Sequence, residues 1–226
     1  MLFLVLGRGR TGSLVAQVAA ERGHGVRVVG EEENRNAAAL TAPVLAGFDA
    51  IIDFTTPEAA VQNMRACLAT GARVVVGTTG WYQYFEDMKA LCLRKQAALL
   101  YSTNFSVGVQ VLFRITQELA SAAHGYQFTI SETHHAAKKD APSGTALSLE
   151  KILKAARPGL NVEIHSKREG EVAGLHEVEA RSETDRIVLQ HEAFSRRGFA
   201  EGAVRAAEWV AGKTGCWDFQ DIFAEL

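Results

Sequence analysis

Residues 2–12 read LFLVLGRGRTG, and this stretch decides which fold the chain adopts. The five apolar residues over 2–6 are typical of a strand that is covered on both faces, as in a parallel sheet. A glycine-rich turn follows directly, and apolar residues then recur at helical spacing as far as Gly23. A second apolar run over 26–29 completes a strand–helix–strand unit. This order predicts an α/β protein that begins with a parallel sheet.

The turn over 7–12 has the residue types that bind a pyrophosphate. Glycines permit a tight turn and a close approach of phosphate oxygens, and the N–H groups at a helix start favour negative charge. Glu31 stands at the end of the second strand, where a carboxylate can accept hydrogen bonds from ribose hydroxyls. Three glycines alone could be only a loop, but the strand before them and the helix after them favour dinucleotide binding. The expected ligands of the dinucleotide are Gly7, Arg8, Gly9, Arg10, Thr11, Gly12 and Glu31.

Alternating strand and helix patterns continue to residue 105 and predict a Rossmann-type doubly wound sheet. Further strands are expected over 48–54, 74–76 and 97–101, with helices over 57–69 and 81–94. The segment 31–47 is interpreted as a polar loop with at most one short helix.

From residue 126 the pattern changes to period-two alternation, which predicts a second, α+β domain with a mixed sheet. Strands are expected over 127–133, 162–168, 176–182 and 186–193, and helices over 106–123 and 143–155, one of them lying on the sheet. A helix of small residues over 199–212 is expected to return to the first domain. The predicted boundaries are therefore 1–105 with 197–226, and 106–196.

Composition excludes several classes of protein. With 226 residues, of which 47% are hydrophobic and 22% charged, the chain can bury a core, and disorder is not expected. A net charge of −2 gives no basic footprint for nucleic acid, and no apolar run approaches the roughly 20 residues of a spanning helix. Cys67, Cys92 and Cys216 lack the spacing of a metal or redox motif, which favours a reducing, cytoplasmic location.

Residues 132–145 read ETHHAAKKDAPSGT and hold the densest group of reactive side chains. Two imidazoles precede two lysines, and Pro142 leads into a helix start whose N–H groups at Ser143, Gly144 and Thr145 could bind a carboxylate or phosphate. A solvated loop before an ordinary helix cap would also fit each feature taken singly. An acid/base group, a cation and an anion-binding helix end within one short stretch together favour a reaction site.

The pattern Glu132-x-His134-His135-x-x-Lys138-x-Asp140-Ala141-Pro142-Ser143-Gly144-Thr145-Ala146 resembles the signature of the dihydrodipicolinate reductases of lysine biosynthesis. Further similarity lies at residues 53–55, 77–80, 104–108 and 199–203, so the resemblance covers essentially the whole chain. The family usually has one more residue in the glycine turn and a methionine where Thr11 stands.

The resemblance implies reduction of 4-hydroxy-tetrahydrodipicolinate, a cyclic imine dicarboxylate, to tetrahydrodipicolinate with a hydride from NADH or NADPH. It implies that the first domain binds the dinucleotide and that the second binds substrate and joins subunits into a homotetramer. His134 is the expected proton donor, and Lys138 the expected cation, able also to supply a proton. Substrate contacts are expected from His135, Ser143, Gly144, Thr145 and Arg196. The nicotinamide side of the cofactor is expected at Gly77, Thr78, Thr79, Ser102, Thr103, Asn104 and Phe105.

Histidines at 134, 165, 176 and 191 could be imagined as a metal set, but their spacing follows no ligand motif, and no metal is expected. Two other functions stay open. A different Rossmann-fold dehydrogenase acting on an amino-acid-derived carbonyl or imine would share the glycine turn but should lack the stretch 132–145. A non-catalytic nucleotide sensor should have lost His134, Lys138 and Thr145, which are intact here.

Overall fold

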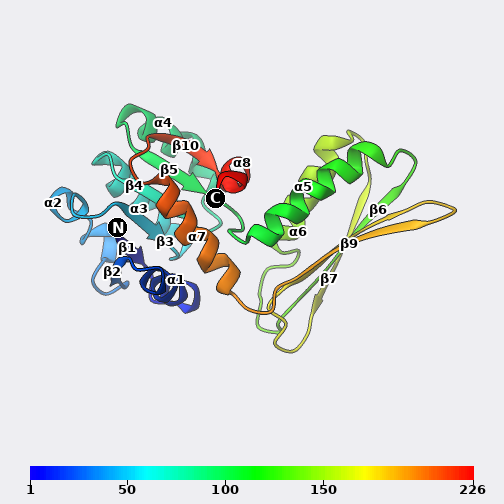
Figure 1. Ribbon diagram of the computed structural model, residues 1–226, viewed down its shortest axis with the longest axis horizontal. Helices are drawn as coiled ribbons and strands as arrows, with labels where there is room; N and C mark the ends of the chain where they lie inside the picture. Colours follow the sequence, from blue (N-terminus) through cyan, green and yellow to red (C-terminus); the bar gives the residue numbers. More distant parts are fainter. The chain divides into compact units, whose positions relative to one another are not determined.

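The computed structural model describes all 226 residues and divides them into two compact units (Figure 1). The first unit comprises Met1–Ser106 and Arg197–Leu226, and the second comprises Val107–Arg196. No helix in either unit is both long and apolar enough to cross a membrane.

The first unit is built on a six-stranded sheet in which every pairing is parallel. Its strand order is β10-β5-β4-β3-β1-β2, with the chain winding outward in both directions from β1 and β3. The strands are β1 (Leu2–Leu6), β2 (Gly25–Val29), β3 (Ala50–Asp53), β4 (Arg73–Val76), β5 (Ala98–Tyr101) and β10 (Gly215–Asp218). The predicted doubly wound sheet is confirmed.

Helices cover both faces of this sheet, and the apolar run that opens the chain shows why. Phe3 and Val5 pack in one core with residues of α1 (Arg10–Glu21) and α7 (Arg197–Val210). Leu4 and Leu6 pack in a second core with residues of α3 (Pro57–Ala69) and α4 (Phe85–Arg94). Because successive side chains point to opposite faces, a strand between two helix layers must be apolar at every position.

Two predictions for the first unit were wrong. Strand β10 was not expected, since it has only four residues, one of them a glycine with a φ of 140°, and all four are only partly buried. The segment 31–47 was expected to hold at most one short helix, yet it contains the 3₁₀ turn η1 (Arg35–Ala37) and the helix α2 (Ala42–Leu45). The remaining short elements are η2 (Tyr82–Tyr84), α8 (Phe219–Ile222) and η3 (Phe223–Glu225).

The second unit is built on a four-stranded mixed sheet, as predicted, and its strand order is β7-β6-β8-β9. Its strands are β6 (Gln127–His134), β7 (Val162–Arg168), β8 (Leu175–Arg181) and β9 (Arg186–Glu192). β6 pairs with β7 in parallel, and the other pairs are antiparallel. Both α5 (Val107–Ala122) and α6 (Gly144–Ala156) contribute to the core on this sheet, whereas only one helix was expected there.

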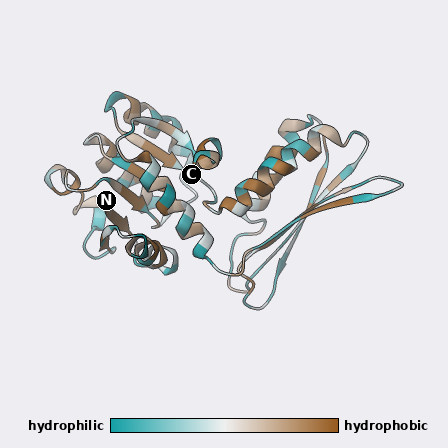
Figure 2. Ribbon diagram, in the orientation of Figure 1, coloured by the Kyte–Doolittle hydropathy of each residue, from teal (hydrophilic) through white to brown (hydrophobic).

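One face of the second sheet is buried and the other is not. Along β6, every second residue from Phe128 to His134 is buried, and the residues between them are partly exposed. Figure 2 shows that the strands of the first sheet are mostly apolar in colour, whereas those of the second are mixed. The buried face is apolar at Phe128 and Ile130 but polar at Glu132 and His134. The candidate site lies at this polar end.

Candidate active site

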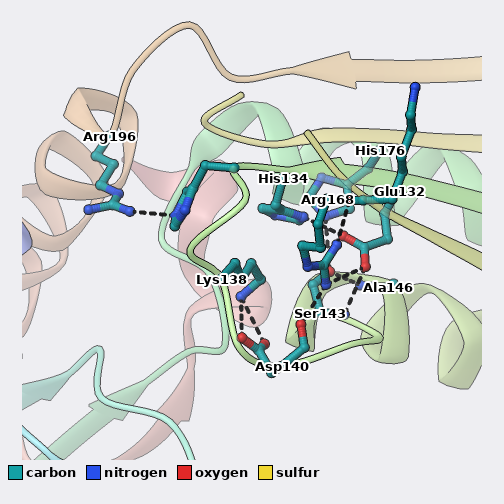
Figure 3. Close-up of polar contacts among 11 residues, drawn as sticks. Glu132, His134, Lys138, Asp140, Ser143, Ala146, Arg168, His176 and Arg196 are labelled. Atoms are coloured by element: carbon teal, nitrogen blue, oxygen red, sulfur yellow. Dashed lines mark hydrogen bonds and ion pairs between the residues drawn. The ribbon is translucent and has the colours of Figure 1, made fainter. Parts of the chain in front are cut away.

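The centre of the site is a buried pair formed by Glu132 and His134. The two side chains point to the same face of β6, and His134 Nδ1 makes a hydrogen bond to Glu132 Oε2 (Figure 3). The Glu132 side chain has no exposed surface, and His134 is 8% exposed. A carboxylate on one ring nitrogen fixes the orientation of an imidazole and leaves the other nitrogen for chemistry.

Arg168 and the start of α6 hold Glu132 in place. Arg168 Nη2 donates to Glu132 Oε1 at 2.9 Å, and the backbone N–H of Ser143 donates to the same oxygen at 3.3 Å. Burial alone would raise the pKa of Glu132, but hydrogen bonds from Arg168 and Ser166 and the nearby His134 outweigh it and lower the pKa to about 2. The carboxylate is therefore ionised at neutral pH.

Arg168 also ties the loop after β6 to this pair. Its Nη2 donates to the backbone oxygen of Asp140, whose carboxylate accepts from Lys138 Nζ at 2.7 and 2.8 Å. A chain of contacts thus runs from Lys138 through Asp140 and Arg168 to Glu132 and His134. Burial lowers the pKa of His134, Glu132 opposes that effect, and the charges of Lys138 and Arg168 add to it.

His176 completes the cluster from β8. Its ring lies 5.0 Å from that of His134, edge to face, and its Nε2 is 3.2 Å from Ser143 Oγ. The side chain is 3% exposed, and its Nδ1 is buried without a hydrogen-bond partner. Burial, with the charge of His134, lowers the pKa of His176 to about 3, so the ring is neutral at pH 7.

Glu132, His134 and His176 could together offer three ligand atoms within 4.8 Å of one another, as a metal site would. Both oxygens of Glu132, however, already accept hydrogen bonds, one of them from a guanidinium. A metal would have to displace Arg168 from a buried carboxylate. The arrangement is better suited to holding and moving a proton.

The start of α6 differs from the expected anion nest in one respect. Ser143 is the N-cap, and its Oγ accepts from the N–H of Ala146 at 3.2 Å. The N–H of Ser143 donates to Glu132, so this group is not available to a ligand. A β-carbon at Gly144 would meet nothing within 4 Å, so the space directly beside this residue is open. Thr145 is buried in the same turn.

The expected substrate residues His135 and Arg196 contact each other. Arg196 Nη2 donates to His135 Nε2 at 3.1 Å, which joins the end of the second unit to the loop after β6. Among the residues named from the sequence, His134, His135, Lys138, Ser143, Gly144, Thr145 and Arg196 therefore all lie around the polar end of β6 or the start of α6.

Arg168 and His176 were not assigned to the site from the sequence, and Glu132 was quoted only as part of the motif. The strand register places Arg168 and His176 beside the Glu132–His134 pair. Arg168 pairs with His134 across β6 and β7, and His176 pairs with Glu132 across β6 and β8. Alternation predicts which face a side chain takes but not which residue lies opposite it.

The glycine turn of the first unit has room for phosphate oxygens. Gly9 is the N-cap of α1 with no side chain covering the helix end, and a β-carbon there would meet nothing within 4 Å. Gly7 and Gly12 are needed for close packing, since a β-carbon at Gly7 would lie 2.2 Å from the Phe54 oxygen and one at Gly12 equally close to the Gly7 oxygen. The first N–H groups of a helix have no partner within it, so this end suits a pyrophosphate.

Around this turn, Arg8 forms an exposed ion pair with Glu33, beside the expected ribose ligand Glu31. The turn after β4 is tied down by Thr78, whose hydroxyl donates to buried Asp53 at 2.8 Å and accepts from the N–H of Thr55 at 2.8 Å. Burial raises the pKa of Asp53 against these hydrogen bonds. Sequence reasoning did not assign Asp53 to a site.

The loop after β5 is held by its own side chains. Ser102 Oγ donates to the Asn104 backbone oxygen at 2.7 Å, and Asn104 Oδ1 accepts from the N–H of Ser106 at 2.8 Å. Phe105 is 2% exposed, with its ring 4.8 Å from that of Phe219, so it also serves the core.

Two family models match the chain, and together they span nearly all of it. Residues 1–105 match the model described as dihydrodipicolinate reductase, N-terminus, and residues 108–223 match that described as dihydrodipicolinate reductase, C-terminus. A 4-hydroxy-tetrahydrodipicolinate reductase of Christiangramia forsetii is 35% identical over 240 aligned positions, covering 100% of this chain and 99% of that protein. A protein of the same name from Natronomonas pharaonis is 36% identical, covering 94% and 96%.

Solved structures show the same fold. A dipicolinate-bound dihydrodipicolinate reductase from Paenisporosarcina sp. TG-14 has a TM-score of 0.78 at 20% identity, covering 98% of this chain and 99% of that one. A probable dehydrogenase from Thermotoga maritima has a TM-score of 0.66 at 11% identity, covering 98% and 92%.

Proposed function

The chain belongs to the dihydrodipicolinate reductase family, and we propose on that premise that it reduces 4-hydroxy-tetrahydrodipicolinate to tetrahydrodipicolinate with NADH or NADPH, in lysine and diaminopimelate biosynthesis. The net reaction adds one hydride and one proton to the ring and releases water. The observation that carries the proposal is the match of both family models to a chain whose second unit holds a buried, carboxylate-bound histidine.

The nicotinamide cofactor supplies the hydride when it is bound. In the proposal, the first unit binds it through the turn over 7–12, Glu31, the residues 77–79 and the loop 102–105. The open helix end at Gly9 and the exposed carboxylate of Glu31 support this assignment.

The second unit binds the substrate in this proposal. A relative of known structure carries dipicolinate, a planar dicarboxylate, which supports a small dicarboxylate ligand. Two carboxylates require cations and N–H groups as partners. The cations come from Lys138 and Arg196, with His135 beside them, and the N–H groups come from the first turn of α6 at Gly144 and Thr145, which Ser143 caps. His134 donates the proton to the position where hydride addition leaves an electron pair.

A coupled assay tests the function. Dihydrodipicolinate synthase generates the unstable substrate in the cuvette, and loss of reduced nicotinamide absorbance reports its reduction by the purified protein. We expect substrate-dependent oxidation of at least one of the two cofactors. The absence of oxidation with both cofactors, in a protein that still binds dinucleotide, would overturn the proposal in favour of another dehydrogenase or a nucleotide sensor.

A further inference from the structure

Two features of the second unit are not explained by carboxylate binding, namely the fixed position of Glu132 and the glycine at 174. We propose that Glu132, held by Arg168, is a positioning residue that makes Nε2 of His134 the atom that gives its proton to the substrate, and that Gly174 keeps this nitrogen uncovered. The inference rests on the proposed function and specifies which nitrogen of its proton donor carries the transferred proton.

The first part concerns the Nδ1 side of His134. Glu132 Oε2 accepts from Nδ1, and Glu132 Oε1 accepts from Arg168 Nη2 and the N–H of Ser143. With both oxygens engaged and the side chain fully buried, the carboxylate cannot turn away or exchange its partner for water. An ionised carboxylate offers only acceptors, so Nδ1 must keep its proton in every charge state of the ring. The proton that leaves is therefore the one on Nε2.

The second part concerns the space beside Nε2. A β-carbon built on Gly174 would lie 3.2 Å from His134 Nε2, which is tighter than an ordinary van der Waals contact, and 3.5 Å from Cδ2, which is an ordinary contact distance. The φ of Gly174 does not lie in the left-handed region, so the backbone at this position does not require glycine. Its carbonyl accepts from the N–H of Ala193 at 2.8 Å, which fixes the backbone in place. Glycine is thus explained by the space it leaves next to Nε2.

The charged and titratable groups around His134 come from every neighbouring element. They are Glu132 on its own strand, Arg168 on β7, His176 on β8 and Lys138 in the following loop. His176 in turn faces His191 on β9, and both have lowered pKa values because of burial. Only Glu132 favours the protonated form of His134, so it alone opposes burial and the two cations.

The proton transfer balances without a further reactant. Before the step, His134 is an imidazolium with Nδ1–H bound to Glu132 and Nε2–H facing the substrate. As the hydride arrives, the Nε2–H bond breaks and its proton bonds to the substrate atom that holds the new electron pair. A neutral imidazole with Nδ1–H remains, still bound to Glu132, and a proton from bulk solvent, the one that the net reaction consumes, returns to Nε2.

Nitrogen NMR of ¹⁵N-histidine-labelled protein tests the tautomer without any turnover. We expect the neutral ring of His134, assigned by its loss in His134→Gln, to carry its proton on Nδ1. A neutral ring with the proton on Nε2 would overturn the proposal. Because this readout needs no substrate, it remains decisive if the coupled assay shows that the proposed function fails.

The Glu132→Gln variant tests the positioning role through the pH profile. Without the carboxylate, burial and the cations lower the pKa of His134 further, so the alkaline limb of kcat should move to lower pH. We expect kcat to fall on the order of 100-fold at pH 8, with a clearly smaller loss at pH 6 and cofactor binding unchanged. An equal loss at all pH values would indicate a purely structural role and contradict the proposal.

Gly174→Ala supplies a second test that leaves the buried cluster intact, should the glutamine variant not fold. We expect kcat to fall at least about tenfold, with cofactor affinity unchanged, because a methyl group covers Nε2. Gly47→Ala is the matched control, since its β-carbon would make only an ordinary contact of 3.6 Å and its φ is also outside the left-handed region. Wild-type kcat in a folded Gly174→Ala protein would refute the role of this glycine.

Discussion

At the scale of single residues, the proposed proton donation by His134 gives the most specific prediction, because it should affect turnover without affecting cofactor binding. We expect His134→Gln to lower kcat about 100-fold or more, which is what a positioned general acid contributes. The KM for the cofactor should change little, because the glycine turn belongs to the first unit. Steady-state kinetics in the coupled assay measure both, and near-normal turnover would remove His134 from the mechanism.

Lys138 and Asp140 can be separated by a pair of variants. Lys138 Nζ contacts both carboxylate oxygens of Asp140, so the lysine is held in position while its charge is partly neutralised. We expect Lys138→Ala to raise KM for the substrate, since a lost carboxylate contact weakens binding, and to lower kcat as well if the lysine supplies a proton. Asp140→Asn should have a smaller effect, because the cation remains.

The comparison of these two variants decides the role of the lysine. If Lys138→Ala and Asp140→Asn both leave kcat and KM unchanged, Lys138 is only surface charge. If Asp140→Asn is the more damaging of the two, the ion pair matters for the loop rather than for the substrate.

The residues of the site that could be predicted from the sequence are those that lie close together along the chain. His134, His135, Lys138 and the α6 cap fall within one stretch, and each has a residue type suited to its role. Arg168 and His176 could not be found this way, because they reach Glu132 only through strand pairing. No sequence pattern pointed to Gly174, since its proposed role depends on the position of one ring nitrogen of His134.

At the scale of elements, the residues that follow β2 lead to a prediction of the cofactor preference. Glu31, Glu32 and Glu33 follow this strand, where a 2′-phosphate would be repelled. One like-charge pair at about 4 Å costs on the order of 4 kcal/mol near a surface, and even a tenth of that changes an equilibrium about twofold. We therefore expect kcat/KM with NADH to be at least equal to that with NADPH.

The arginines near this turn provide the test. Arg8 is paired with Glu33, so its charge is already engaged, whereas Arg10 and Arg35 make no ion pair in the structure. Glu33→Gln should release Arg8 and raise kcat/KM with NADPH while leaving that with NADH nearly unchanged. A preference of tenfold or more for NADPH in the wild type would show that an arginine outweighs the acidic run, with Arg35→Ala as the next variant.

The pairing of β6 with β8 buries His176, and this burial predicts that the second unit loses stability in acid. His176 has a folded-state pKa of about 3, below the 6.5 of an ordinary histidine, so the unfolded chain binds more protons between these values. Stability from this group is complete above pH 6.5 and is lost as the pH falls toward 3, at up to about 1.4 kcal/mol per pH unit. His176→Gln should flatten this slope.

Hydrogen exchange of β6 and β8, corrected for intrinsic rates, measures this local stability. Tryptophan fluorescence would not, because Trp81, Trp209 and Trp217 all belong to the first unit. His165→Gln is the matched control, since its side chain is exposed on the other face of the sheet. Equal pH slopes in the wild type and His176→Gln would contradict the assignment.

Most elements of the fold follow from apolar periodicity, and the exceptions have physical reasons. Strand β7 and the helix α3 begin and end where the sequence pattern predicts, because a proline or glycine stands near each of their ends. Strand β10 was missed because it owes its conformation to pairing with β5 rather than to its own residues. The packing of α5 on the second sheet was missed because periodicity shows an apolar stripe but not its partner.

At the scale of the whole molecule, the open face of the second sheet is the basis for a prediction of the oligomeric state. The residues of β6 on this face, Thr129, Ser131 and Thr133, are partly exposed, and Val188 on β9 is 40% exposed. The helices α5 and α6 contribute only to the core on the opposite face. An antiparallel face of this kind can stay in water, but together with the family resemblance it supports a homotetramer joined through the second unit.

Light scattering after size exclusion tests the assembly, and we expect four times the monomer mass. Val188→Asp places a carboxylate on the open face opposite Glu179, so it should shift the protein toward smaller species. Val111→Asp is the control, because Val111 is 42% exposed on α5 and lies off this face. A wild-type monomer at micromolar concentration would contradict the proposed assembly. A tetramer that tolerates Val188→Asp but not Val111→Asp would place its interface on the helices.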